Sequence, residues 1–151
     1  PSYQQNRRIS MLRSAVHRIV MASAIRSQVL GNVPTRRRRL EILEESHRIL
    51  EPGGIISLSV HDLEKTKRLI DIAGQQYEES EDLEPGDLLL AQASGKSCYW
   101  HCFRMEELRD ICAIAGFTIL LLSTSDEMGQ DYDNLIIIVC QKPLCNVEVI
   151  G

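Results

Sequence analysis

Apolar residues between residues 35 and 61 follow a helical spacing and then form a short continuous run. Thr35 is a good N-cap for the predicted helix, and the Pro-Gly-Gly turn at residues 52–54 ends it. The run Ile55–Val60 then predicts a strand that is covered on both faces. A helix that passes through such a turn into an apolar run is the second half of a β-α-β unit. The apolar stripe of the helix comprises Leu40, Leu43, His47 and Leu50, widened by Ile42 and Ile49.

The other face of this helix is charged. Residues 36–39 are four consecutive arginines, which we place on the solvent side. Glu41 and Glu45 are four residues apart and should repel each other, whereas Glu44 and Arg48 should attract. The helix is therefore amphipathic, with little net effect from its local charge pairs.

The same patterns predict the rest of the chain. Asp62 is a plausible N-cap for a helix over Leu63–Tyr77 whose inward residues are Leu69, Ile70 and Ala73. The turn at residues 93–96 predicts a β-hairpin between two short strands. Arg104 precedes a further helix but cannot cap it, because arginine has no hydrogen-bond acceptor. The remaining predicted elements are a helix over Gln4–Ala15, strands over His17–Ala24, Asp87–Ala91 and Ser97–Phe103, a helix over Met105–Ala115, and strands over Phe117–Leu122 and Leu135–Gln141.

Two segments carry a family resemblance. LEESHRILEPGGIISLSV at residues 43–60 and YWHCFRMEELRDICAIAGFTILLL at residues 99–122 resemble segments in the C-terminal half of class I S-adenosylmethionine (SAM)-dependent methyltransferases of type 11 or 12. The resemblance covers roughly residues 16–143. It implies an α/β fold with a partial Rossmann-like sheet of parallel strands. It also implies an antiparallel last strand, inserted between its neighbours, and an inserted hairpin.

The resemblance implies S-adenosyl-L-methionine as the cofactor. The family binds it with a glycine-rich turn after the first strand, where glycine lets the backbone approach the ligand closely. The sequence contains no GxG or GxGxxG spacing. We therefore expect a single methyltransferase-like domain over residues 1–151 that lacks this N-terminal unit, with residues 78–103 as a substrate-side insertion. Whether the chain alone is an enzyme stays open.

The resemblance also suggests where ligands bind. In open α/β sheets they bind beyond the carboxyl ends of the strands. Four residues at the end of the predicted strand 17–24 are the cofactor-binding candidates, although two of them could merely cap and turn the chain. These four are Ser23, Ala24, Ser27 and Gln28.

Four residues are candidates for the acceptor side. His61 and His101 are catalytic candidates, because histidine exchanges protons near neutral pH. Tyr99 and Trp100 are substrate-binding candidates on the hairpin. The alternatives are that His61 is only a polar strand end and that core packing explains either Tyr99 or Trp100.

Charge is uneven along the chain. Residues 1–50 hold ten arginines and three glutamates, and the remainder holds eighteen acidic residues against seven basic ones. A basic half favours RNA as a partner, whereas its shortage of aromatic residues favours a solvated helix face. The downstream segment resembles methyltransferases that act on modified tRNA uridines, and small-molecule methyltransferases nearly as much.

The five cysteines form no CxxC pair and indicate reduced thiols. A metal site is not expected, because Cys98 and Cys102 would share one face of a strand and His101 the other. No membrane span or signal peptide is visible, which predicts a cytoplasmic protein.

These observations predict a methyltransferase portion that transfers a methyl group to RNA or a small molecule. The alternative is a non-catalytic methyltransferase-like module for interaction or dimerisation. In either case the edge of the first strand requires a cover. We expect that cover to be a second copy of the chain, in a homodimer, or an N-terminal half or segment.

Overall fold

The computed structural model describes residues 29–79, 82–129 and 134–144. Several predictions lie outside these ranges: the helix 4–15, the strand 17–24, and the four cofactor-binding candidates Ser23, Ala24, Ser27 and Gln28. The predicted parallel pairing of residues 19–24 with residues 55–60 also lies outside them.

The main sheet has the strand order β1-β6-β5. Its strands are β1 (Ile55–His61), β5 (Thr118–Thr124) and β6 (Leu135–Gln141). β6 pairs antiparallel with both neighbours, as predicted for the last strand, so β1 and β5 run in the same direction. Among the described residues, the parallel contact is an isolated bridge between Asp62 and Phe103, and the strand pairings are antiparallel.

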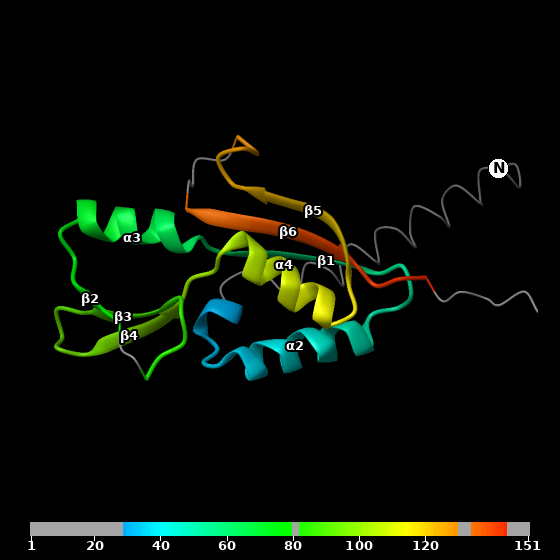
Figure 1. The fold of residues 1–151 in the computed structure, drawn as a ribbon, viewed down its shortest axis with the longest axis horizontal. Coiled ribbons are helices and arrows are strands. Elements are labelled where there is room, and N and C mark those ends of the chain that lie inside the picture. Colours follow the sequence, from blue (N-terminus) through cyan, green and yellow to red (C-terminus); the bar gives the residue numbers. More distant parts are fainter. Residues whose placement is uncertain (1–28, 80–81, 130–133, 145–151) are drawn as a thin grey trace, which may run out of the picture.

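Two helices cover one face of this sheet (Figure 1). They are α2 (Arg36–Ile49) and α4 (Met105–Ile114), which pack against each other, while α4 also contacts β5 and β6. β1 turns Ile56, Leu58 and Val60 into the core between the layers and leaves Ser57 exposed. Ile55, Ser59 and His61 on that second face are only partly buried. Within the described ranges the strand is therefore fully buried on one face and not, as was expected, on both.

The buried stripe of α2 differs from the predicted one. Thr35 caps the helix as expected, because its hydroxyl accepts a hydrogen bond from the Arg38 amide. However, Arg39 is 0% exposed and Ile49 is 54% exposed. Placing all four arginines toward solvent was wrong for Arg39, which lies one turn before the buried Leu43 on the same stripe.

The surface ion pairs of α2 also differ. Glu41 pairs with Arg37, and Arg48 pairs with Glu45 rather than with Glu44. Each of the two glutamates expected to repel has an arginine partner instead, so the repulsion is offset.

The helix α3 (Leu63–Ile72) begins as predicted. Asp62 accepts a hydrogen bond from the Lys65 amide at 2.8 Å and caps it. It ends five residues before the predicted Tyr77. Ile70 is buried as expected, but Leu69 and Ala73 are exposed; the inward stripe is instead formed by Leu63, Thr66 and Ile70.

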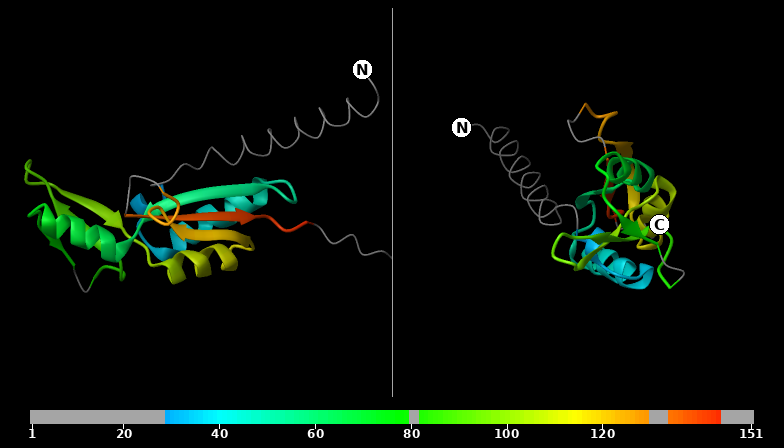
Figure 2. Two further views of the ribbon diagram at one scale, coloured as in Figure 1. Left: turned by 90° about the horizontal axis from the view of Figure 1, so that it is seen from above. Right: turned by 90° about the vertical axis from the view of Figure 1, so that its left-hand side faces the viewer.

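A second sheet lies beside α3, with the strand order β2-β3-β4. It consists of β2 (Tyr77–Glu78), β3 (Asp87–Ala91) and β4 (Ser97–His101). The predicted hairpin is β3–β4, and β2 was not predicted. The views in Figure 2 show this sheet at one end of the molecule. The short 3₁₀ helix η1 (Leu30–Asn32) contacts both β4 and β1 and thus joins the two sheets. No helix within the described ranges is long and apolar enough to cross a lipid bilayer.

Candidate functional site

A cavity lies where the carboxyl end of β1 meets β4 and η1. Its volume is about 240 Å³. Gly31 of η1 forms one wall, and a Cβ atom there would lie 3.2 Å from the backbone oxygen of His101. η1 therefore approaches β4 at a position without a side chain. The cavity is lined by Gly31, Asn32, Val60, His61, Cys98, Trp100 and His101.

The rings of His61 and Trp100 are stacked in this wall. Their centroids are 4.9 Å apart and their planes differ by 2°. Asn134 places its amide nitrogen 3.2 Å from His61 Nδ1, so in this orientation the amide donates and the ring proton is on Nε2. Burial lowers the pKa of His61 below its usual 6.5. The imidazole is consequently neutral near pH 7.

His101 is held differently. Its side chain is buried, with Nδ1 2.6 Å from Asp87 Oδ1 and Nε2 2.9 Å from Glu107 Oε1. Both ring nitrogens are thus occupied by carboxylate oxygens. Neither nitrogen is free to exchange a proton with a ligand in the cavity. This geometry favours a positioning role for His101, which was predicted as a catalytic residue.

Tyr99 points to the other side of β4 from Trp100, as the alternation of strand residues requires. Its hydroxyl donates to Asp87 Oδ1 at 2.7 Å, and burial together with this bond raises its pKa. Tyr99 therefore contacts the polar cluster around Asp87 and does not line the cavity, where it was predicted to bind substrate.

Arg39 completes this polar cluster from α2. It donates to the backbone oxygen of Val33 at 3.0 Å and forms an ion pair with Glu84 in the loop before β3. Its guanidinium carbon lies 5.8 Å from the ring centroid of Phe103. The cluster thus ties α2 to the second sheet. Its members are Arg39, Glu84, Asp87, Tyr99, His101 and Glu107.

Glu84, Asp87 and His101 have ligand atoms within 4.8 Å of one another, as a metal site would require. However, Arg39 binds Glu84 and the His101 ring binds Asp87. The carboxylates of the trio are therefore already bound by side chains of the protein. We therefore assign the trio to the ionic cluster.

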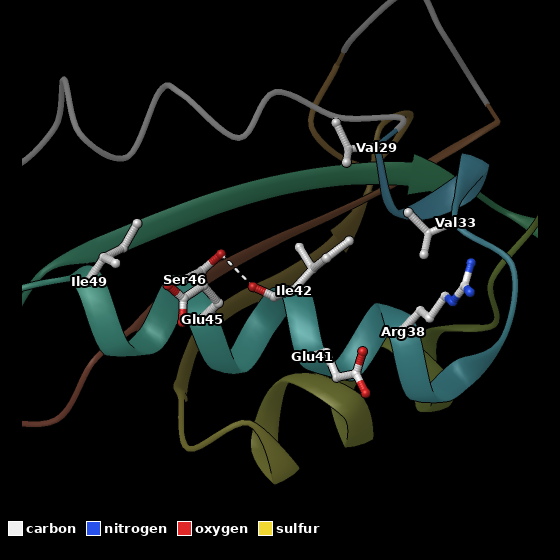
Figure 3. Close-up of a pocket in the computed structure, with 8 residues that line it drawn as sticks. All are labelled: Val29, Val33, Arg38, Glu41, Ile42, Glu45, Ser46 and Ile49. Carbon is white, nitrogen blue, oxygen red and sulfur yellow. Dashed lines mark hydrogen bonds between the residues drawn. The ribbon is translucent and has the colours of Figure 1, made fainter.

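A larger hollow runs along α2, with a volume of about 590 Å³ (Figure 3). It is lined by Val29, Val33, Arg38, Glu41, Ile42, Glu45, Ser46 and Ile49. Ser46 donates its hydroxyl to the backbone oxygen of Ile42 at 2.8 Å, and Glu45 binds Arg48. The polar groups of Glu41, Glu45 and Ser46 are thus engaged within the helix, which leaves Arg38 as the other polar side chain of the lining. The smaller cavity, at the carboxyl end of β1, is the better candidate site.

The sequence predicted part of this site. His61 and Trp100 meet in the cavity. Asp87, Glu107 and Asn134 were not anticipated, although an aspartate that opens an apolar strand signals a buried partner.

Comparison with protein-family models gives no match, and comparison with curated proteins gives none either. Solved structures do match. A SAM-dependent methyltransferase from Methanosarcina mazei has 22% identity and a TM-score of 0.58, and the match covers 78% of this chain and 57% of the other. The chain has the fold of the class I SAM-dependent methyltransferases.

Two further structures carry the same fold. A SAM-dependent methyltransferase from Clostridium acetobutylicum has 8% identity and a TM-score of 0.54, with 77% of this chain and 55% of the other covered. The glycopeptide N-methyltransferase MtfA has 14% identity and a TM-score of 0.52, with 79% and 56% covered. The chain therefore matches little more than half the length of these methyltransferases, and at such identities the likeness shows the fold alone.

Proposed function

We propose that this chain is the C-terminal portion of a SAM-dependent methyltransferase and that it holds the methyl acceptor in the cavity between β1, β4 and η1. The observation that carries the proposal is the stack of His61 on Trp100 at the carboxyl end of β1. Open α/β sheets bind their ligands beyond the carboxyl ends of their strands. The shared fold supports the reaction class.

The proposed cofactor is S-adenosylmethionine, with which MtfA has been solved as a complex. It would supply an electrophilic methyl group. The described residues contain no glycine-rich turn between a strand and a helix, and Gly53 lies at the opposite end of β1 from the cavity. They therefore do not form a cofactor pocket by themselves. The cofactor contacts are proposed for Ser23, Ala24, Ser27 and Gln28, which lie outside the described ranges, and no step is derived through the cofactor.

His61 is the proposed general base. Its imidazole is neutral near pH 7 and can take a proton from an O–H or N–H of the acceptor. In the present amide orientation Nε2 holds the proton. A half-turn of the Asn134 amide lets its oxygen accept from Nδ1–H and leaves the lone pair on Nε2. The proton then moves from the acceptor atom to Nε2, and Trp100 orients the acceptor.

The cavity favours a small-molecule acceptor over RNA. Its lining residues in the described ranges include no arginine or lysine, and the exposed arginines at the start of α2 lie elsewhere. RNA binding depends on contacts between such side chains and phosphates. The predicted tRNA substrate therefore has less support than a compact molecule.

Calorimetric titration of the chain with SAM and with its demethylated product tests the proposal. We expect the four cofactor candidates at residues 23–28 to give saturable heat with both ligands, and His61→Gln should leave the cofactor affinity unchanged. A null titration at millimolar ligand would refute autonomous methyl transfer.

A null result would instead support the interaction or dimerisation module, which the absence of a glycine-rich turn from the sequence favours. Among the described residues β1 pairs on one side only, with β6. We propose that a second copy or an N-terminal half covers the other edge. Light scattering would show a dimer in the first case.

A further inference from the structure

We infer that the methyl acceptor is a small, uncharged, flat ring that lies against the stacked pair Trp100–His61. The inference rests on the proposed function for the assignment of the cavity to the acceptor. It concerns the substrate class, which the shared fold leaves open.

The shape of the wall argues for a flat ligand. Trp100 and His61 both line the cavity, and their planes differ by only 2°. Because the two rings are parallel, a flat ligand can take the same orientation relative to both of them. Such a wall suits an aromatic partner that stacks with an offset or meets the rings edge to face. A puckered ring of the same size gains less from such a wall.

The charges around the cavity argue for a neutral ligand. His101 has both ring nitrogens bound to the carboxylates of Asp87 and Glu107. Arg39 is buried against Glu84 and is not part of the lining. Among the described residues, the charged side chains next to the cavity are thus already paired, and an ionic ligand would lose hydration without gaining a counter-ion from them. In the part of the lining that the structure describes, the polar side chains left for a ligand are those of Asn32, His61 and Cys98.

The dimensions argue for a small ligand. The cavity holds about 240 Å³, below the roughly 300–1,000 Å³ of sites for drug-sized molecules. Its wall at η1 is formed by Gly31, where a Cβ would press within 3.2 Å of the His101 backbone oxygen. The space between η1 and β4 is consequently set by backbone and cannot widen by rotation of a side chain.

Three probes separate these properties: phenol is flat and neutral, benzoate is flat and charged, and cyclohexanol is neutral but puckered. Trp100 is the only tryptophan of the chain, so its fluorescence reports the cavity directly. We expect phenol to bind the full chain roughly tenfold more tightly than either of the others, about what one aromatic contact contributes. Equal or tighter binding of benzoate or cyclohexanol, or no effect of any probe on Trp100, would overturn the inference.

Variants test the location. Trp100→Leu, followed by ligand-detected NMR, should weaken phenol binding about tenfold, whereas Trp100→Phe should retain most of it. Tyr77→Leu, on β2 and outside the cavity, is the matched control and should leave phenol binding unchanged. Cys98→Arg adds a cation to the lining and should reverse the preference in favour of benzoate; an unchanged preference contradicts the assignment.

These measurements need no cofactor. If the probes rank as expected while SAM fails to bind, the proposed function is wrong and the ring site remains. If SAM binds but the probes do not rank as expected, the proposed function remains and the ring site is wrong.

Discussion

Arg39 of α2 and Glu84 of the loop before β3 form an ion pair in which the arginine side chain is 0% exposed and the glutamate 37%. The same guanidinium also contacts Val33, Tyr99 and Glu107. One buried cation thus joins the helical layer to the hairpin sheet, and the carboxylates around it depend on its charge. Its Nε atom is buried and has no hydrogen-bond partner in the part of the chain that the structure describes.

Arg39→Met should therefore destabilise the protein strongly. The substitution keeps much of the apolar volume but leaves carboxylates without their partner, and because Glu84 is 37% exposed the free energy of unfolding should fall by about 1–3 kcal/mol. Arg37→Met is the control, because Arg37 and Glu41 form a largely exposed pair. Its cost should be about 1 kcal/mol or less. Urea titrations of both variants provide the measurement, and equal losses would show that Arg39 is no more important than a surface arginine.

Gly86, in the turn before β3, is a second test of how the hairpin is held. It has φ +100°, and an added Cβ would lie 2.4 Å from the backbone oxygen of Cys102. Gly95 in the hairpin turn also has a positive φ, +75°, but a Cβ there would meet nothing within 4 Å. Both alanine variants carry the cost of a left-handed conformation, about 1 kcal/mol.

Only Gly86→Ala adds a clash with backbone, which cannot rotate away. We expect this clash to cost about 1–3 kcal/mol more than the loss in Gly95→Ala. Thermal unfolding of the two variants is the measurement. Similar melting temperatures would contradict the close approach of residue 86 to β4.

The sequence predicted those features that depend on local chemistry. The caps at Thr35 and Asp62 and the hairpin at residues 87–101 follow from residues close together in the chain. The position of β6 between its neighbours came from a family resemblance rather than from periodicity. Local patterns alone do not specify which strands pair, because pairing depends on contacts between distant segments.

The predictions for Arg39 and His101 failed for the same reason. Arg39 was placed in solvent because its type is normally exposed, yet its place on the helix belongs to the stripe of Leu43. His101 was taken for a free proton carrier, and its partners Asp87 and Glu107 come from a strand and a helix that only the fold brings together. Residue type suggested their chemistry, but tertiary partners decided it.

The start of α4 allows a stabilising substitution. Arg104 occupies the N-cap with extended backbone geometry and makes no side-chain cap hydrogen bond. Arg104→Ser should supply an acceptor for the first turn and raise the free energy of unfolding by about 1 kcal/mol. The exposed pair that Arg104 forms with Glu64 contributes little to offset this gain.

The reciprocal change is the control for this prediction. Asp62→Ala removes a cap that is present at α3 and should cost about 1 kcal/mol. Denaturant midpoints of both variants give the comparison. A less stable Arg104→Ser protein would show that the ion pair outweighs the cap.

The pH dependence of stability should carry the signature of His61. Burial lowers the pKa of this side chain in the folded protein below its ordinary 6.5. As the pH falls below 6.5, the unfolded chain therefore binds a proton at His61 that the folded protein does not. The unfolded state then holds more protons, and the free energy of unfolding falls with pH until the folded-state pKa is reached. Above 6.5 the residue contributes no pH dependence.

His61→Gln removes this contribution while the other histidines keep theirs. The difference in unfolding free energy between the wild type and the variant should be constant from about pH 7.5 to about pH 6.5. As the pH falls further toward about 5, the wild type should become less stable relative to the variant. Trp100, stacked on the imidazole, reports the same event by fluorescence, with a midpoint below 6.5 in the folded protein. Parallel stability profiles would show that burial does not lower the pKa of His61, and a fluorescence midpoint well above 6.5 would show that His61 is charged at neutral pH and would remove it as the proposed base.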